Sequence, residues 1–397
     1  MYVKGARLPL SGVLMLAGLV ALAPLGTDIY LSAVPSMAAS YGVSLDDIEL
    51  SISFFLIGIS LGQLMGGPLS DRFGRRKTVT AGVLVFAMAS IGIVFFNQLS
   101  SLLGLRLIQA LGVGLASVSA MAVVRDISTG RDGAGNMMRV VQIMMAAPLV
   151  APMLGMIIYR YLGWPAIFVF LMLYSLVLLL FFLRLAPETS PMAVKGNPLV
   201  TYGQLLCDRR VWPGLASACG AYAILFSFIT ASPTVYMGYF GLDSDLFPFA
   251  FGANVIAMIA LGQVNIRLLK RFPTTTLIVL GQCVQLAAGS LMVLYLLLSA
   301  APSFWVVLAL VMAFMSCHAL VVSNSISSTT EFFPDKAGSA TALLSASGFM
   351  SGALIGSLTG VFADGTPMPM AAIMLSACAA GLVLRFLLRR GLEPVSD

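Results

Sequence analysis

Three ionisable side chains interrupt the long apolar runs of this 397-residue chain. Asp28 lies in "TDIYLSAVP" (27–35), Arg106 in "LRLIQALGVG" (105–114), and His318 in a later apolar stretch. A charged side chain in hydrocarbon costs roughly 3 kcal/mol unless it is protonated, paired or wetted. Such residues more often mark a path for ions or substrates than a structural need, so they are the first candidates for chemistry.

Helices that cross a lipid bilayer must position these residues. Hydrophobic residues make up 59% of the chain and charged residues only 10%, whereas a soluble domain carries about 25% charge. Runs of about 20 apolar residues cross a bilayer as helices. Twelve such runs are present, approximately at 9–36, 48–69, 77–97, 99–124, 137–162, 165–185, 212–238, 246–270, 275–299, 303–328, 338–362 and 369–389. We therefore predict an all-α polytopic membrane protein with twelve transmembrane helices.

The runs divide into two halves. Residues 1–185 hold six of them and residues 212–397 the other six, with a linker at 186–211 that is rich in proline and glycine. The first run continues well past the cleavage-like "ALA" at 21–23, so an uncleaved first helix is expected rather than a signal peptide.

Basic residues predict the orientation. If the N-terminus is cytoplasmic, every lysine and arginine except Arg106 and Arg160 falls on the cytoplasmic side. This asymmetry is the positive-inside rule, and with an even number of spans it places both termini in the cytoplasm. The net charge of +6 then reports topology; the basic residues are dispersed over short segments, and nucleic-acid binding is not predicted.

Asp28 and Arg106 are expected at similar depth. Asp28 lies about nine residues from the outer end of the first run and Arg106 about seven from the outer end of the fourth, which at 1.5 Å per residue differ by a few ångström. The pattern indicates an ion pair or a shared wet cavity. A fixed salt bridge that only locks two helices is the alternative, although buried ion pairs stabilise poorly compared with apolar packing.

No enzyme or metal site is predicted. The five cysteines lack C-x-x-C spacing, and a single histidine cannot complete a metal site with them. No phosphate-binding glycine loop is present either, so any process that needs energy would have to draw on an ion gradient, and no cofactor is expected. Asp28 is the best proton carrier, since burial and a neighbouring arginine act on a carboxyl group in opposite directions and a change in either would load or release a proton.

The stretch "GPLSDRFGRRK" (67–77) ends the second run. Asp71 would lie at a helix C-terminus, the wrong end for an anion, and therefore needs a partner. Gly74 permits a tight reversal. A plain positive-inside loop explains the arginines but neither Asp71 nor Gly74.

These residues resemble a known family. The stretch matches the G-x-x-x-D-R-x-G-R-R loop of the major facilitator superfamily through Gly67, Asp71, Arg72, Gly74, Arg75 and Arg76. Arg106 and Gln109 resemble its fourth-helix motif R-x-x-Q-G, and Pro152 and Gly155 its fifth-helix antiporter motif G-P-x-x-G. The segment "TDIYLSAVP" is similar to the T-D-M-Y-L-P-A-L-P of the bicyclomycin and chloramphenicol-resistance exporters, which are drug:proton antiporters.

The resemblance implies two pseudo-symmetric six-helix bundles that rock about a central cavity in a bacterial inner membrane. The implied partners are a small-molecule substrate, protons and the lipid bilayer, and the implied state is a monomer. It further implies that Arg75 bridges to Asp126 and that Asp71 belongs to a conformational latch. The partner of Asp71 is left open between the arginine cluster and the start of the eleventh helix near 337–339.

Other expectations concern packing and the cavity. Glycines at four-residue spacing, 58–66 in the second helix and 348–360 in the eleventh, serve either contact between the halves or packing within one half. Pro148 and Pro152 should bend the fifth helix. Aromatic, sparsely polar walls suit lipophilic substrates. The candidates for this cavity are Tyr30, Gln109, Tyr222, Phe226, Tyr236, Asn254 and His318.

The sequence thus favours a proton-coupled exporter of small, mostly lipophilic molecules such as drugs. The alternative is a related carrier for a physiological metabolite, such as a sugar, nucleoside or amino-acid derivative. A receptor or structural protein with an inactive transporter fold is less favoured, because both Asp28 and Arg106 are kept.

Overall fold

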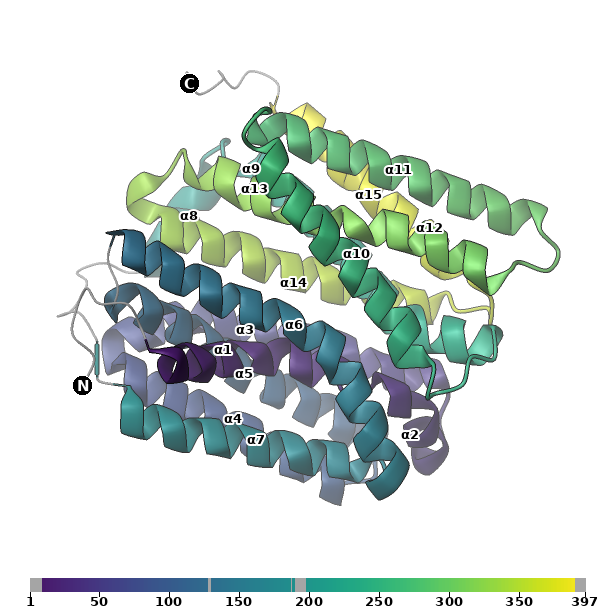
Figure 1. Ribbon diagram of the computed structural model, residues 1–397, viewed down its shortest axis with the longest axis horizontal. Helices are drawn as coiled ribbons and strands as arrows, with labels where there is room; N and C mark the ends of the chain where they lie inside the picture. Colours follow the sequence, from purple (N-terminus) through teal and green to yellow (C-terminus); the bar gives the residue numbers. More distant parts are fainter. Residues whose placement is uncertain (1–8, 128–129, 187, 190–197, 390–397) are drawn as a thin grey trace. The chain divides into compact units, whose positions relative to one another are not determined.

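The computed structural model describes residues 9–127, 130–186, 188–189 and 198–389, with side chains placed except at 130–134 and 198–199. These residues form helices and no strand (Figure 1). The first half contains α1 Leu10–Asp28, η1 Leu31–Ala33, α2 Val34–Tyr41, α3 Leu45–Phe73, α4 Arg75–Phe95, α5 Leu99–Ile127, α6 Gly130–Leu162 and α7 Pro165–Leu185. The second contains α8 Pro198–Cys207, α9 Trp212–Pro233, η2 Thr234–Tyr239, α10 Phe247–Leu268, α11 Thr274–Leu298, α12 Phe304–Ser316, α13 His318–Thr330, η3 Pro334–Lys336, α14 Ala337–Val361 and α15 Met368–Arg389.

The prediction of twelve spans is confirmed. Twelve helical stretches in the described residues are long and apolar enough to cross a membrane, and their ends lie within a few residues of the predicted ends. The largest difference is at the first span, which continues to Tyr41. A backbone in hydrocarbon must form its hydrogen bonds within the protein, and an α-helix does so within a single apolar run of this length.

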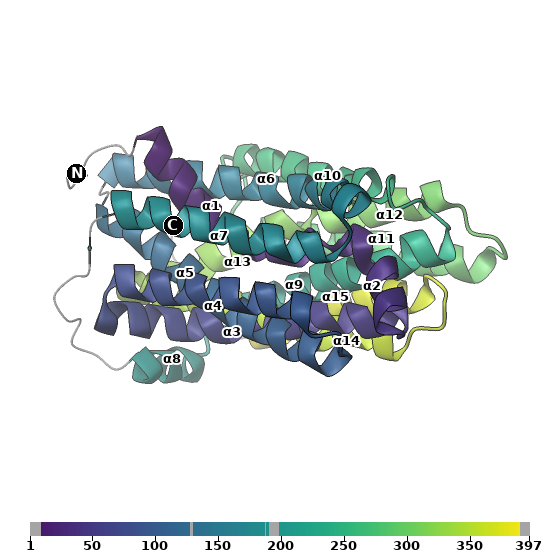
Figure 2. The same ribbon diagram turned by 90° about the horizontal axis from the view of Figure 1, so that it is seen from below.

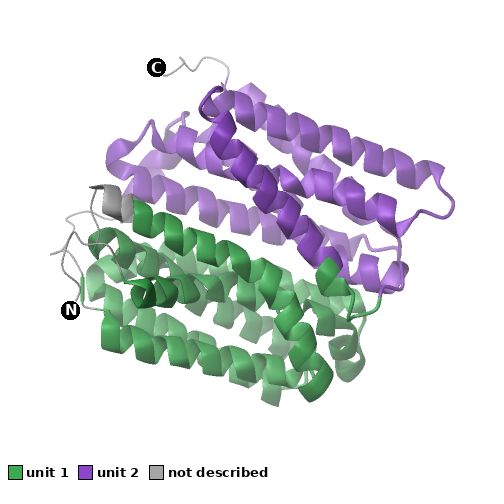
Figure 3. Ribbon diagram, in the orientation of Figure 1, with its two compact units in different colours: residues 1–195, 243–249 green, residues 196–242, 250–397 purple. Residues whose placement is uncertain are grey.

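The chain divides into two compact units (Figure 3). Unit 1 comprises Met1–Lys195 and Asp243–Phe249, and unit 2 comprises Gly196–Leu242 and Ala250–Asp397. Part of the predicted linker, residues 187 and 190–197, lies outside the described residues. The rest of that linker, α8 included, is counted with one unit or the other.

The glycine stripes pack within their own units. A Cβ atom on Gly58 or Gly62 of α3 would lie 2.3 or 2.5 Å from a backbone oxygen of α5. A Cβ atom on Gly348 or Gly352 of α14 would lie 2.4 or 2.5 Å from the ring of Tyr222 or Phe226 on α9. Such distances mean that only glycine allows these helices to approach so closely. Of the two readings left open by the sequence, packing within one half accounts for these residues.

Three spans contain a break or an irregular turn. The first span leaves α-helical geometry after Asp28, and the two segments α1 and α2 are visible in Figure 2. The seventh continues from α9 into η2, a π-helical turn that follows Pro233. The tenth is divided between α12 and α13, and the second of these begins at His318. Irregular turns inside helices occur frequently at functional sites, and here they coincide with residues selected from the sequence.

Candidate functional site

Asp28 is the last residue of α1, at the break in the first span. Its side chain is almost completely buried, with 2% of the residue exposed, and its Oδ1 atom has no hydrogen-bond partner among the described residues. The following turn is closed by the amide of Ala33, which donates to the carbonyl oxygen of Tyr30 at 2.8 Å. A carboxylate here is shielded from bulk solvent and lies at an unfavourable helix end, because a helix C-terminus carries partial negative charge.

Arg106 is held in α5 by groups other than Asp28. Its Nη1 atom donates to Gln109 Oε1 at 2.7 Å, and Gln109 Nε2 donates to Ser90 Oγ on α4, also at 2.7 Å. The guanidinium carbon lies 4.6 Å from the ring centroid of Tyr30 and 4.1 Å from that of Phe55. Desolvated cation–π contacts of this kind are worth up to about 2 kcal/mol each. The cation is therefore fixed between two aromatic rings.

Tyr30 connects this cation to the break in the first span. The residue is fully buried and its hydroxyl group shares a hydrogen bond of 2.7 Å with Ser51 Oγ on α3. The sequence assigned Tyr30 and Gln109 to the substrate cavity. The structure buries both residues and places their side chains against Arg106, and their assignment to the cavity stays a prediction.

Asp28 and Arg106 interact electrostatically but do not form an ion pair. The ion pairs found among the described residues join other groups, and two nitrogen atoms of Arg106, Nε and Nη2, have no hydrogen-bond partner there. Each group nevertheless experiences the charge of the other. The fixed salt bridge considered from the sequence is therefore absent from this part of the chain, and the carboxyl group is not committed to one partner.

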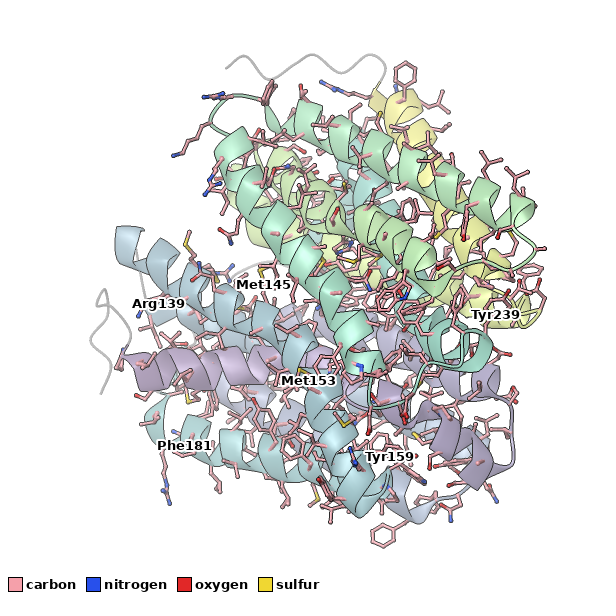
Figure 4. The ribbon with its side chains drawn as sticks, turned by 45° about the vertical axis from the view of Figure 1, so that its right-hand side comes forward. Arg139, Met145, Met153, Tyr159, Phe181 and Tyr239 are labelled. Carbon is pink, nitrogen blue, oxygen red and sulfur yellow. The ribbon has the colours of Figure 1, made fainter. Side chains whose placement is uncertain are left out.

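The fifth span packs directly on the break. Gly155 of α6 is buried, and a Cβ atom added to it would lie 1.6 Å from the carbonyl oxygen of Ile29, the residue after Asp28. Pro148 and Pro152 lie inside the same continuous helix. Figure 4 shows its axis turning between the labelled residues Met145 and Tyr159. The proline and glycine motif thus brings the α6 backbone against the turn that carries Asp28.

In unit 2, His318 lies at the edge of an aromatic cluster. Its ring stands edge-on to Tyr222, with centroids 5.4 Å apart, and Phe226 and Phe349 lie 6.2 and 5.1 Å from Tyr222. The His318 Nδ1 atom is 3.0 Å from the carbonyl oxygen of Ala221. Since a carbonyl only accepts, Nδ1 carries the proton. His318 is thereby held against α9 at the start of α13.

The remaining cavity candidates lie elsewhere in unit 2. Tyr236 is fully buried in η2, 5.3 Å from the ring of Phe304 and 6.0 Å from that of Phe228. Asn254 of α10 is 3% exposed; its amide nitrogen donates to the carbonyl oxygen of Ala250 at 2.9 Å, while its Oδ1 has no partner among the described residues. The structure thus separates the predicted aromatic wall into two clusters.

The motif at the α3–α4 turn forms a compact ion network in unit 1. Arg75 is buried and pairs with Asp71, and its Nε atom donates to Asp126 at the end of α5 at 2.9 Å. The Arg75–Asp126 contact implied by the resemblance is thus present, and of the two partners left open for Asp71 the arginine occurs here. Gly74 has a φ of 100°, a conformation that side chains other than glycine rarely adopt. Gly67 lies in the last turns of α3, while Arg72 is exposed beside Phe73.

Glu188 completes this network and was missed from the sequence. Its carboxylate accepts hydrogen bonds from the backbone amides of Arg75 at 2.9 Å and Arg76 at 3.2 Å. The helix α4 begins directly after Gly74 without a capping side chain, so its first amides need an external acceptor. The need for an acceptor at the start of α4, together with the acid in "APET" (186–189), could have pointed to Glu188 from the sequence.

Comparison with known proteins identifies the family. The sequence profile described as "Major Facilitator Superfamily" matches residues 16–357. The chain belongs to this superfamily. It is accordingly a membrane transporter and not an enzyme.

Several relatives of this chain are bacterial. A bicyclomycin resistance protein homolog of Haemophilus influenzae is 29% identical over 94% of each chain. A chloramphenicol resistance protein of Pseudomonas aeruginosa is 33% identical over 70% of this chain and 67% of its own. The multidrug resistance protein MdtL of Shewanella oneidensis is 28% identical over 72% and 73%. With its twelve apolar helices, the chain is a multi-pass protein of the bacterial inner membrane.

A solved structure shows the same fold. The crystal structure of a D-xylose-proton symporter superposes with a TM-score of 0.73 and covers 96% of this chain and 98% of its own, at 15% sequence identity. At this identity the likeness concerns the fold alone.

Proposed function

We propose that this transporter exports small, mostly lipophilic molecules in exchange for protons by alternating access, with Asp28 as the proton carrier and Arg106 as its charge partner. The names of its relatives support drug efflux as the physiological class. The observation that carries proton coupling is the state of Asp28. It is a buried carboxyl group at a helix break, next to a cation and without an ion pair among the described residues.

The geometry supports different roles for Arg106, as a fixed positive charge, and Asp28, as the group that binds the proton. Arg106 is held by Gln109, Tyr30 and Phe55, so its position does not depend on whether Asp28 carries a proton. Its field stabilises the carboxylate after proton release, whereas burial stabilises the protonated form. Movement of the turn after Asp28, or entry of water, changes the balance between the two. A substrate that competes for Asp28 would couple its own movement to the proton.

The aromatic cluster in unit 2 supports lipophilic substrates. Tyr222, Phe226 and His318 supply flat apolar surfaces with few polar groups, which suit molecules with a large apolar body. We further propose that both termini are cytoplasmic, that the protein works as a monomer, and that the proton gradient is its only energy source.

We also propose that the network around Arg75 is the latch of the transport cycle. Asp71 is paired with Arg75 but its side chain remains 35% exposed, so it retains oxygen lone pairs for a further partner. The N-terminal amides of α14, near Ala337, would suit an anion in the state in which the cytoplasmic side is closed.

The substitution Asp28→Asn tests the proposal, because it keeps the size of the side chain and removes the titration. In proteoliposomes with an imposed pH gradient, we expect transport of chloramphenicol or bicyclomycin to be abolished, while exchange of substrate without a gradient persists. Asp364→Asn, which changes an exposed carboxylate, is the matched control and should transport normally. Full gradient-driven transport by Asp28→Asn would remove this residue from the mechanism.

A substrate panel separates drug export from metabolite transport. The same vesicles are loaded with a sugar, a nucleoside or an amino-acid derivative. We expect the drugs alone to exchange with protons. Proton-coupled flux of one metabolite, with none for the drugs, would favour the alternative carrier.

A further inference from the structure

Arg385 is a buried cation outside the site described above. It lies in α15, one turn before that helix ends, and only 3% of the residue is exposed. The sequence counts it among the dispersed charges of the cytoplasmic face, but the structure places it against α9. Its Nη1 atom lies 3.3 Å from Ser217 Oγ and 3.5 Å from the carbonyl oxygen of Pro213. Its Nε atom is buried without a hydrogen-bond partner among the described residues.

The charges around Arg385 do not compensate it. Within the described part of the chain no ion pair includes it, and Arg389, one turn further along α15, adds a second positive charge. The beginning of α9 is the positive end of that helix dipole, whereas the end of α15 offers Arg385 and Arg389 only the partial negative charge of a helix C-terminus. Asp208, which precedes α9, is engaged by Arg210 at 2.8 Å, and this contact holds the pKa of Asp208 below its ordinary value. The positive charge of Arg385 is therefore not neutralised by a carboxylate in an ion pair within the described residues.

The neighbouring surface is apolar and membrane-like. Leu384, Phe386 and Leu387 are 49%, 64% and 52% exposed on the same turn of α15. Trp212, the first residue of α9, is 39% exposed, and its indole nitrogen donates to the carbonyl oxygen of Leu206 at 3.0 Å. Tryptophan beside arginine at the end of an apolar helix is typical of the membrane–water boundary. A free anion gains nothing from contact with these apolar side chains, whereas the acyl chains of a lipid pack favourably against them.

We propose that Arg385 and Arg389 bind the phosphate of an anionic phospholipid, in the leaflet at this end of the bundle. That leaflet is the cytoplasmic one in the proposed topology. A guanidinium donates to two oxygens of a phosphate at once, which would use the Arg385 nitrogen left without a partner. The acyl chains would lie against the exposed apolar turn of α15. The site is independent of proton coupling and of the transported substrate.

Trp212 can report binding directly. In a Trp164→Phe, Trp305→Phe background it is the remaining tryptophan of the three in the chain. The purified full-length protein is titrated with brominated phosphatidylglycerol or brominated phosphatidylcholine, and quenching of its fluorescence is measured. We expect tighter apparent binding of the anionic lipid. Arg385→Gln should reduce this preference by about tenfold or more, as expected for the loss of charge-assisted hydrogen bonds.

The matched control is Arg271→Gln, which removes one exposed positive charge from another turn of unit 2 and should leave the preference unchanged. An equal loss in both variants would show general surface attraction and overturn the proposal. Release of the quenching by excess inorganic phosphate would assign the site to a free anion and overturn the lipid assignment. If Arg385→Gln does not fold, the protein with Arg385 intact still decides, because equal quenching by both lipids would contradict an anionic-lipid site.

Discussion

Replacement of Gly155 by alanine should disrupt coupling by moving the turn that carries Asp28. A methyl group at this position would lie 1.6 Å from the carbonyl oxygen of Ile29, and real Cβ atoms essentially never approach closer than 3.0 Å. Either α6 or the turn after Asp28 must therefore move by roughly 1.4 Å, the difference between these two distances. The obstacle is backbone, so no side-chain rotation can relieve it.

The magnitude follows from this displacement. Overpacking of a well-packed interior costs about 1–3 kcal/mol, which the twelve-helix protein should survive. Misplacement of a reacting group by about 1 Å lowers rates by about a hundredfold in enzymes. We therefore expect gradient-driven transport to fall by roughly tenfold to a hundredfold in Gly155→Ala, with membrane insertion retained.

The assay compares pH-driven drug transport in proteoliposomes with substrate exchange and with thermal unfolding in detergent. Gly104→Ala in α5 is the matched control, because no heavy atom lies within 4 Å of the added methyl group. It should transport normally and gain slight stability from helix propensity, at most about 1 kcal/mol. Normal transport by Gly155→Ala, at the level of Gly104→Ala, would refute the coupling between α6 and the turn after Asp28.

Three further outcomes are expected. Arg106→Lys should transport at roughly a tenth of the normal rate, since an ammonium keeps the charge but cannot stack flat between the rings of Tyr30 and Phe55, and Arg106→Ala should hardly transport at all. Equal rates for the Lys variant and the unchanged protein, measured in the same vesicles, would mean that only the charge matters. Asp71→Asn should shift the population toward the inward-facing state by about tenfold to a hundredfold, as expected for a lost charge-assisted contact. Spin-label distances between the two units measure this shift. An unchanged distance distribution with normal flux would mean that the motif sets only the membrane topology. Glu188→Gln should lower the free energy of unfolding by on the order of 1 kcal/mol, because a negative charge is removed from the N-terminus of α4. Thermal unfolding tests this expectation, and an unchanged midpoint temperature would show that the Glu188 cap contributes little.

The ends of the twelve helices could be predicted closely because a lipid bilayer allows few other backbone structures. Backbone groups in hydrocarbon must pair within their own segment, so each apolar run becomes a helix with ends near its own polar flanks. The interruption after Asp28 was not predicted. The residues 29–33 are as apolar as their neighbours, and the turn packs against α6 at Ile29, a contact between segments far apart in the chain. Breaks of this kind leave no signal in hydropathy.

Residue type located the centre of the site but not its surroundings. Asp28 and Arg106 are conspicuous in sequence because charges are rare in lipid. Gln109 and Tyr30 are not, since a polar or aromatic residue in a span can equally face a cavity or another helix. The structure alone assigned them to Arg106, because the decision depends on which helices are neighbours.

The sequence by itself determined the membrane environment, the number of spans, the family and the two charged residues at the centre of the site. Only the tertiary structure decided that Arg106 is held by rings and an amide rather than by Asp28, that Glu188 caps α4, that the glycines serve packing within each unit, and that Arg385 is buried. The physical reason is the same in each case. Composition and periodicity report what a residue costs in lipid and which face of its helix it occupies, whereas its partner is set by contacts between segments far apart in the chain.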